Sequence, residues 1–351
     1  MTVPARQSSR VEAGRPLHQI FNKADQNVPV SPSLITLLSV LRPPYRLRSV
    51  YERLLGTEVE IQVVARTRRQ AEAAERAALD ELERLSAVFN RFDPGSELSR
   101  WLARPGQQTP LSPELQTVLV LTDGWREVTA GAFHPGADAL GKLWQTADTR
   151  GQEPAAESLA ALVRHLQSAP WMLHDDGSAT LHAAYPLGLN ALAKGWIVDR
   201  MVELAWSLPG IRAVMINAGG DLRTTGGRGL EVMVADPFTA RDDDPPLVQV
   251  HLQNGALASS GSAYRGVQVG DRWHSHLIDP RSGLPVQNVS GVTVTAPDCA
   301  TADALATALS VLGLQAGLTL TDGTPGCAAL IITPDGQRHP STLWPPDVPV
   351  R

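Results

Sequence analysis

The amino-acid sequence predicts an α+β fold in which antiparallel β-sheets carry flanking helices. Short alternating or apolar runs, typical of strands, recur along the chain. Many of these runs are joined by short turns, whereas the helical patterns come in two or three blocks. Strands joined by short turns pair antiparallel, so we expect antiparallel sheets. We expect the helices to pack on these sheets.

The first strand and helix are predicted from residue periodicity. Within residues 56–65, Val59, Ile61 and Val63 alternate with polar side chains, which indicates a half-buried strand. Alanines and leucines then recur at helical spacing over residues 67–88, which predicts a long amphipathic helix.

Two further helices are predicted from capping residues. Ser96 ends a Pro/Gly turn and is placed to cap a short helix. Ser112, followed by Pro113 at the first helical position, begins a helix over residues 112–129. Residues 131–136 then form a loop.

The later elements follow the same reasoning. We expect a surface helix within 150–170, a hairpin around 175–177 and a helix over 191–204. An apolar helix should also contain residues 302–309. The remaining short apolar runs predict strands at 213–217, 230–235, 248–252, 255–259, 292–295 and 328–332.

One domain is expected to contain these elements. Residues 1–47 are predicted to be a partly disordered extension that could hold a short helix around 32–41, with structured sequence beginning near Ser49. Residues 48–345 form the predicted domain, a size compatible with one large unit.

Composition excludes several classes of protein. The net charge of −5 and the dispersed arginines give no reason to expect a nucleic-acid partner. No apolar run is long enough to span a membrane, and the two cysteines are expected to be free and buried. The first thirty residues lack the apolar core of a signal peptide, so a cytoplasmic location is expected.

The helix around residues 302–309 carries the most specific chemistry. Asp303 and Thr307 lie one turn apart among apolar residues, and a buried carboxylate needs a partner. Two oxygen ligands on one helix face favour Mg²⁺ or Ca²⁺ over zinc. The alternative is a carboxylate that pairs with backbone N–H groups or with Arg281.

Two histidines precede a charged Pro/Gly turn at residues 279–283. On an extended segment His274 and His276 would share one face, and His276 would point inward together with Ile278. A zinc pair would need further ligands, and none is obvious nearby. His276 is the better candidate for catalysis because it lies nearer the turn, although a lone inward histidine is more often a core residue.

Three small-residue segments could approach a ligand. Residues 218–221, Ala-Gly-Gly-Asp, follow a buried strand and could expose N–H groups, or could form a plain turn. Lys194 and Asp199 bracket a small-residue helix start that suits phosphate, or they could simply reach solvent from a buried helix. Residues 259–262 favour a turn and do not match a hydrolase nucleophile elbow.

Taken in their order along the chain, these motifs resemble the ApbE family of FAD:protein FMN transferases. The resemblance covers roughly residues 49–335. Its most specific parts are His-Leu-Ile-Asp-Pro-Arg-Ser-Gly-Leu-Pro from His276 and Ala-Asp-Ala-Leu-Ala-Thr-Ala-Leu from Ala302. Earlier parts include Phe-Asp-Pro-Gly-Ser-Glu-Leu-Ser-Arg from Phe92 and Leu-Ala-Lys-Gly from Leu192.

The resemblance implies an activity and a set of site residues. It implies an ApbE-like fold and the Mg²⁺-dependent transfer of FMN from FAD to a threonine hydroxyl of an acceptor protein, with release of AMP. It places Asp303, Thr307 and the Ala191 carbonyl on the metal, and makes His276 the group needed for transfer. Its flavin- or nucleotide-contact positions are Gly56, Thr57, Phe92, Glu97, Lys194, Asp199, Gly219, Gly220, Asp221, Ser260, Gly261 and Asp279.

Two alternatives stay open beside transfer: hydrolysis of FAD to FMN and AMP, and FAD binding without turnover. The acceptor protein is not identifiable from the sequence, and either a monomer or a homodimer is compatible with it. The chain also departs from the family pattern. Gly188 and His134 each stand where the family usually has aspartate, Leu55 replaces a frequent methionine, and Trp101-Leu102 replaces Leu-Asn.

Overall fold

The computed structural model describes residues 43–239, 245–261 and 266–345, and its largest feature is an eight-stranded sheet. Every neighbouring pair in this sheet is antiparallel, as the sequence predicts. In spatial order its strands are β1 (Tyr45–Leu54), β2 (Thr57–Ala65), β6 (Ile211–Ala218), β7 (Asp221–Gly226), β10 (Gly255–Gly261), β13 (Gly291–Ala296), β14 (Ala328–Ile332) and β15 (Arg338–Pro340).

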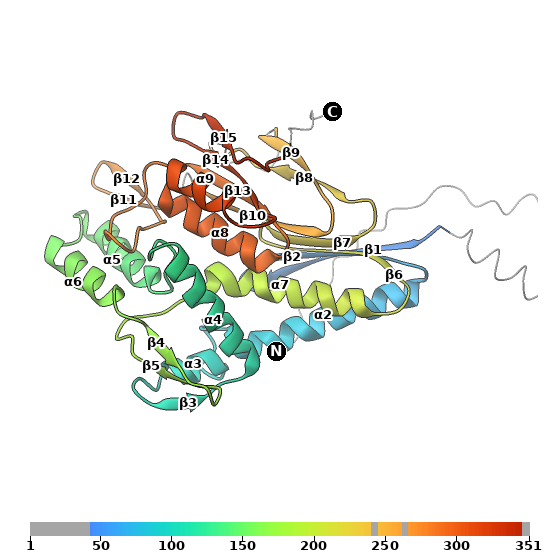
Figure 1. Ribbon diagram of the computed structural model, residues 1–351, viewed down its shortest axis with the longest axis horizontal. Helices are drawn as coiled ribbons and strands as arrows, with labels where there is room; N and C mark the ends of the chain where they lie inside the picture. Colours follow the sequence, from blue (N-terminus) through green and yellow to red (C-terminus); the bar gives the residue numbers. More distant parts are fainter. Residues whose placement is uncertain (1–42, 240–244, 262–265, 346–351) are drawn as a thin grey trace, which may run out of the picture.

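A layer of helices covers one face of this sheet (Figure 1). Its members are α2 (Arg68–Phe89), α7 (Asn190–Ser207), α8 (Cys299–Leu312) and α9 (Leu314–Asp322). The alternation in β2 explains the packing, since Val59, Ile61 and Val63 are all completely buried in the core beneath these helices.

The opposite face of the sheet carries a smaller apolar cluster. A separate hairpin of β8 (Leu230–Val234) and β9 (Val248–Leu252) packs there. Buried residues of the large sheet that join this cluster include Met215, Leu222 and Leu257. The sheet is therefore buried on both faces in its central part.

The remaining elements lie beside the helix layer (Figure 1). They comprise α3 (Glu97–Leu102), α4 (Pro113–Val128), α5 (Ala137–Arg150), α6 (Ala156–Leu166), a small sheet of β3 (Gln108–Pro110), β5 (Ser178–Leu181) and β4 (Trp171–Leu173), and the hairpin β11 (Gly266–Val269)–β12 (Arg272–Ser275). A third apolar cluster joins α5 and α6 to this hairpin through Trp144, Leu159 and Val269.

Several boundaries differ from those that the sequence predicts. β1 begins at Tyr45, inside the segment predicted as an extension. The inward positions of this strand include the polar residue Ser49, so the apolar alternation is too weak to predict the strand from the sequence. The predicted extension up to residue 42, with its helix at 32–41, lies outside the described residues. Helix α5 was not predicted, since it follows Pro135 and Gly136 and contains Gly141. Strands β3, β7, β11, β12 and β15 and helix α9 are also absent from the elements that the sequence predicts.

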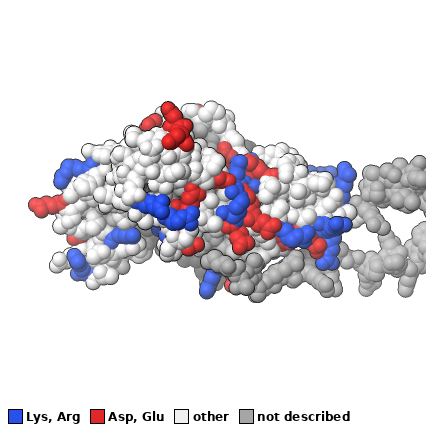
Figure 2. Space-filling model, turned by 90° about the horizontal axis from the view of Figure 1, so that it is seen from below, with Lys and Arg blue, Asp and Glu red and all other residues white. Residues whose placement is uncertain are grey.

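The cysteines, the apolar character of the helices and the surface charge were each considered in the sequence and can be located in the structure. Cys299 and Cys327 are free and buried. Among the described residues, no helix combines the length and the apolar character needed to cross a bilayer. Basic and acidic side chains lie next to one another across the face shown in Figure 2, so this face carries no purely basic patch.

Candidate functional site

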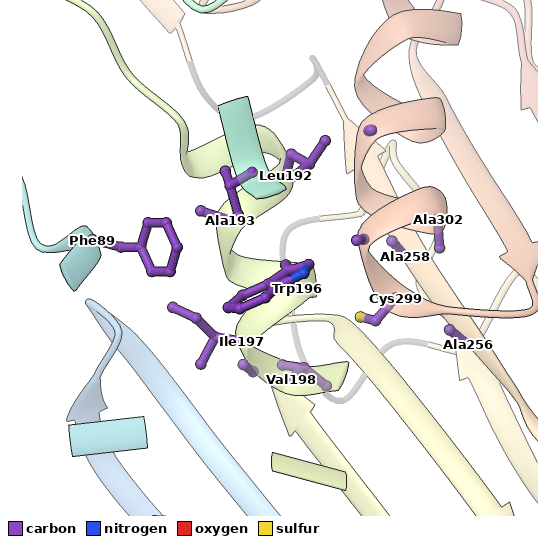
Figure 3. Packing of buried hydrophobic residues seen from close by; sticks show 14 of the residues in the cluster. Phe89, Leu192, Ala193, Trp196, Ile197, Val198, Ala256, Ala258, Cys299 and Ala302 are labelled. Atoms are coloured by element: carbon purple, nitrogen blue, oxygen red, sulfur yellow. The ribbon is translucent and has the colours of Figure 1, made fainter. Parts of the chain in front are cut away.

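Helices α7 and α8 pack against each other at very short range, and this contact builds the centre of the candidate site. A Cβ atom at Gly195 would lie only 2.7 Å from the carbonyl carbon of Cys299, so only glycine fits there. Figure 3 shows Trp196 and Cys299 in the apolar packing around this crossing.

Asp199 fixes the start of α8. Its carboxylate accepts hydrogen bonds from the backbone N–H groups of Cys299 and Ala300, at 2.8 and 2.9 Å, and pairs with Arg223 at 2.8 Å. Burial raises the pKa of Asp199 to about 6, and the Arg223 charge opposes this shift. Asp199 is buried and does not reach solvent, so its clear role here is to position α8; its predicted contact with a nucleotide stays a prediction.

Asp303 lies on the next turn of α8 with an oxygen that lacks a partner. The residue is 8% exposed, and its Oδ2 atom is buried without a hydrogen bond. Burial raises the pKa of Asp303, whereas the charge of Lys194 and the Gly195 N–H lower it. Arg281, the alternative partner, instead forms a two-point ion pair with Asp279 at 2.9 Å. A buried carboxylate with one open oxygen fits a cation.

The other predicted ligands lie on the same two helices. Ala191 lies one helical turn before Gly195 in α7, and the Gly195 N–H lowers the pKa of Asp303. The Asp303 carboxylate therefore lies near the start of α7, which contains Ala191. Thr307 is half-buried one turn beyond Asp303. Within the described ranges no three His, Cys, Asp or Glu side chains form a metal-binding group.

Lys194 connects this helix pair to the turn between β6 and β7. Its ammonium group forms an ion pair with the buried Asp221, the first residue of β7. The Lys194 charge also lowers the pKa of Asp303, so Lys194 acts on two carboxylates. This arrangement concentrates charge at one edge of the site, where a phosphate could also be bound.

Two glycine turns lie side by side next to this ion pair. Gly219 has a φ of +60°, and a Cβ atom there would overlap the Thr57 side chain. Gly219 N–H donates to the Glu58 carbonyl at 3.1 Å, which joins the β1–β2 turn to the β6–β7 turn. The structure thus brings together Gly56, Thr57, Gly219, Gly220, Asp221 and Lys194, six of the predicted contact residues. Ser260 and Gly261 lie at the end of β10, paired with β13.

Phe92 and Glu97 frame the turn that follows α2. The Phe92 ring is 79% exposed, and the Arg91 guanidinium lies 4.9 Å from its centroid. Glu97 accepts a 2.6 Å hydrogen bond from the Ser112 N–H, which anchors α3 to the start of α4. Phe92, unlike Glu97, therefore offers an open surface for an aromatic ligand.

The predicted orientation of His276 is wrong. His274, in β12, is buried and stacks on Trp144 with ring centroids 4.8 Å apart. β12 ends at Ser275 and the chain bends at residue 276, so strand alternation stops and the His276 side chain is exposed. The exposed position keeps His276 accessible to a reacting group.

The turn after His276 is rigid. The Asp279 N–H donates to the Leu284 carbonyl at 2.9 Å, and the Gly283 N–H donates back to the Asp279 carbonyl at 2.8 Å. Trp144 donates from its indole nitrogen to the Gly283 carbonyl at 2.9 Å, which ties the turn to α5. The Asp279 backbone is held by this turn and its carboxylate by Arg281, so both groups already form hydrogen bonds within the loop.

His134 replaces a carboxylate with a neutral acceptor. Its Nδ1 atom accepts a 2.9 Å hydrogen bond from the Gly136 N–H, as an aspartate oxygen at this position could. Burial, and then the charge of Arg126, lower the pKa of His134 to about 4. The imidazole is therefore neutral at pH 7, with its proton on Nε2.

This histidine predicts an acid-sensitive stability. The unfolded imidazole takes up a proton below about pH 6.5 and the folded one only near pH 4, so protonation favours unfolding between these values. The free energy of unfolding of the wild type should fall relative to His134→Asn by up to about 3 kcal/mol as pH drops from 6.5 to 4. Denaturant unfolding at several pH values measures this difference; equal pH slopes in the two proteins would contradict it.

The chain is similar to known proteins of one family. A family model described as the ApbE family matches residues 55–331. A protein named FAD:protein FMN transferase from Treponema pallidum (strain Nichols) is 29% identical over 310 residues, which cover 81% of this chain and 84% of that protein. One of the same name from Chlamydia trachomatis is 31% identical over 241 residues, covering 65% and 72%.

Solved structures agree on the fold. A crystal structure of the ApbE protein from Thermotoga maritima has a TM-score of 0.72 and 26% identity, covering 85% of this chain and 97% of that one. The apo flavinyl transferase ApbE of Pseudomonas stutzeri has a TM-score of 0.71 at 21% identity, covering 86% and 96%. The predicted α+β architecture with antiparallel sheets and flanking helices is thereby confirmed.

Proposed function

Since this chain belongs to the ApbE family, we propose that it is an FAD:protein FMN transferase that requires Mg²⁺, modifies a threonine hydroxyl of an acceptor protein and releases AMP. The names of its relatives support transfer of FMN from FAD. The buried, unpartnered oxygen of Asp303 carries the proposal at the level of the site.

The residues present fit a Mg²⁺ ion. The Asp303 carboxylate, the Thr307 hydroxyl and the Ala191 carbonyl would hold it, and all three are the hard oxygen donors that this ion prefers. When bound, Mg²⁺ would neutralise charge on the FAD diphosphate. Lys194 would supply positive charge to the same anion, with its ammonium group held by Asp221.

The flavin and the reacting groups would take the remaining positions. Phe92 offers an apolar face to the flavin ring, with Arg91 behind it. His276 would accept the proton of the threonine hydroxyl as its oxygen attacks the FMN phosphorus. The bond between that phosphorus and the bridging diphosphate oxygen breaks, and AMP leaves with the bridging oxygen.

A transfer assay tests this function. An acceptor protein produced without its flavin is mixed with FAD, Mg²⁺ and the purified chain, then denatured and analysed by mass spectrometry. We expect the acceptor to gain the mass of an FMN phosphoester on one threonine and to fluoresce in a denaturing gel. Release of FMN and AMP without labelling would indicate FAD hydrolysis, and intact bound FAD would indicate a binding protein; either result would contradict the proposal.

A further inference from the structure

The backbone at Gly188, three residues before Ala191, lies directly against an ion pair from two other elements. Arg91 follows α2, and Asp138 is in the first turn of α5; their side chains form the pair. A Cβ atom at Gly188 would overlap the Asp138 carboxylate and lie 2.7 Å from Nη1 of Arg91. The φ angle of Gly188 is not in the left-handed region, so a side chain here would strain no backbone and would displace only the Asp138 and Arg91 side chains.

This ion pair lies among segments that carry two predicted site residues, Phe92 and Ala191. Arg91 lies over the ring of Phe92, the proposed flavin contact. The Gly188 N–H donates to the Pro135 carbonyl at 2.8 Å, so the chain leading to Ala191 is fixed beside the start of α5. The Nε atom of Arg91 is buried without a hydrogen-bond partner, which increases the dependence of the guanidinium on the Asp138 carboxylate.

We propose that Asp138 is a positioning residue of the flavin site, which supplies from α5 the carboxylate that position 188 lacks. The resemblance to the ApbE family implies an aspartate at the position of Gly188, and here the Asp138 carboxylate occupies the space that a side chain at 188 would enter. From there it holds Arg91 beside Phe92 and next to the segment that ends at Ala191. This inference rests on the proposed function.

Loss of the Asp138 carboxylate, or of the space that Gly188 leaves for it, should weaken FAD binding. Asp138→Ala frees Arg91, and Gly188→Ala displaces the pair sterically, so each should raise the KM for FAD by about 10-fold and change kcat by less than about 2-fold. The melting temperature should change little, because the Asp138 and Arg91 side chains are 42% and 24% exposed and such pairs add little stability. Glu72→Ala, which removes a similar ion pair at the far end of α2, is the matched control and should leave KM unchanged.

Relocation of the carboxylate is the decisive test. In the double variant Gly188→Asp/Asp138→Ala the carboxylate reaches Arg91 from the other backbone, and KM should return to within about 3-fold of the wild type. Gly188→Asp alone places two carboxylates against one guanidinium and should bind FAD worse than the wild type. A double variant no better than Asp138→Ala, or a wild-type KM for Asp138→Ala, would overturn the proposal.

The dissociation constant for FAD, measured by quenching of flavin fluorescence, separates this inference from the proposed function. If the wild type transfers no FMN, the proposed function fails, yet the dissociation constants of the wild type and of the Asp138 and Gly188 variants still report the effect of the ion pair on FAD binding. If transfer occurs and the dissociation constants do not follow the expected order, only the role of Asp138 fails.

Discussion

Asp303→Asn should lower the rate of FMN transfer by roughly 10³-fold, the largest effect expected for a single substitution in this chain. The variant keeps the size of the side chain and removes the negative charge of a carboxylate whose Oδ2 atom is buried and lacks a partner. A neutral amide is a poor ligand for Mg²⁺, so the diphosphate of FAD would lose its main charge stabilisation. Single-turnover kinetics at saturating FAD and Mg²⁺ measures the loss.

The stability of the same variant should move in the opposite direction. Burial raises the pKa of Asp303, so without metal the folded state carries a cost at neutral pH that an uncharged side chain does not. Asp303→Asn should therefore melt at or above the temperature of the wild type in EDTA. Mg²⁺ with FAD should raise the melting temperature of the wild type and leave that of the variant unchanged.

Asp298→Ala on the same helix is the matched control. Asp298 caps α8 by accepting a 2.8 Å hydrogen bond from the Thr301 N–H, so its loss should cost about 1 kcal/mol of stability and retain most of the transfer activity. Asp303→Asn should thus lose activity and keep its stability, whereas Asp298→Ala should lose stability and keep its activity. A wild-type transfer rate for Asp303→Asn would show that this carboxylate holds no catalytic metal.

The parts of the site that the sequence predicts are those set by local pattern. Asp303 and Thr307 share a helix, so their spacing alone places them on one face, and the apolar residues around them predict the burial that the structure shows. The alternation of β2 similarly predicts its buried face. These features depend on residues within a few positions of one another.

The parts that the sequence does not predict depend on contacts between distant segments. Asp199 is buried because the N-terminus of α8, a hundred residues later, docks onto it. Asp138 meets Gly188 only once α5 packs beside the segment before α7, and no spacing in the chain signals that meeting. The inward prediction for His276 failed because the extended conformation stops one residue earlier than the alternation requires.

His276→Asn should lower the rate of FMN transfer by about 10²–10³-fold and leave the dissociation constant for FAD nearly unchanged. The imidazole is exposed, and the backbone beside it is held by contacts of Leu277: its N–H donates to the Ser275 hydroxyl at 3.0 Å, and its carbonyl accepts from the Val286 N–H at 2.9 Å. Asparagine retains a polar side chain of similar reach but cannot accept the threonine proton at neutral pH.

The neighbouring histidine separates catalysis from folding. His274→Asn removes a buried ring that stacks on Trp144, so it should lower the melting temperature while the remaining folded protein transfers FMN at close to the wild-type rate. His276→Asn should show the converse, with an unchanged melting temperature. Since a general base acts only on the reacting hydroxyl, the loss should appear in kcat for the acceptor and not in FAD binding. Equal losses of transfer in both variants would mean that the segment contributes only its fold, and the base would have to be sought elsewhere in the site.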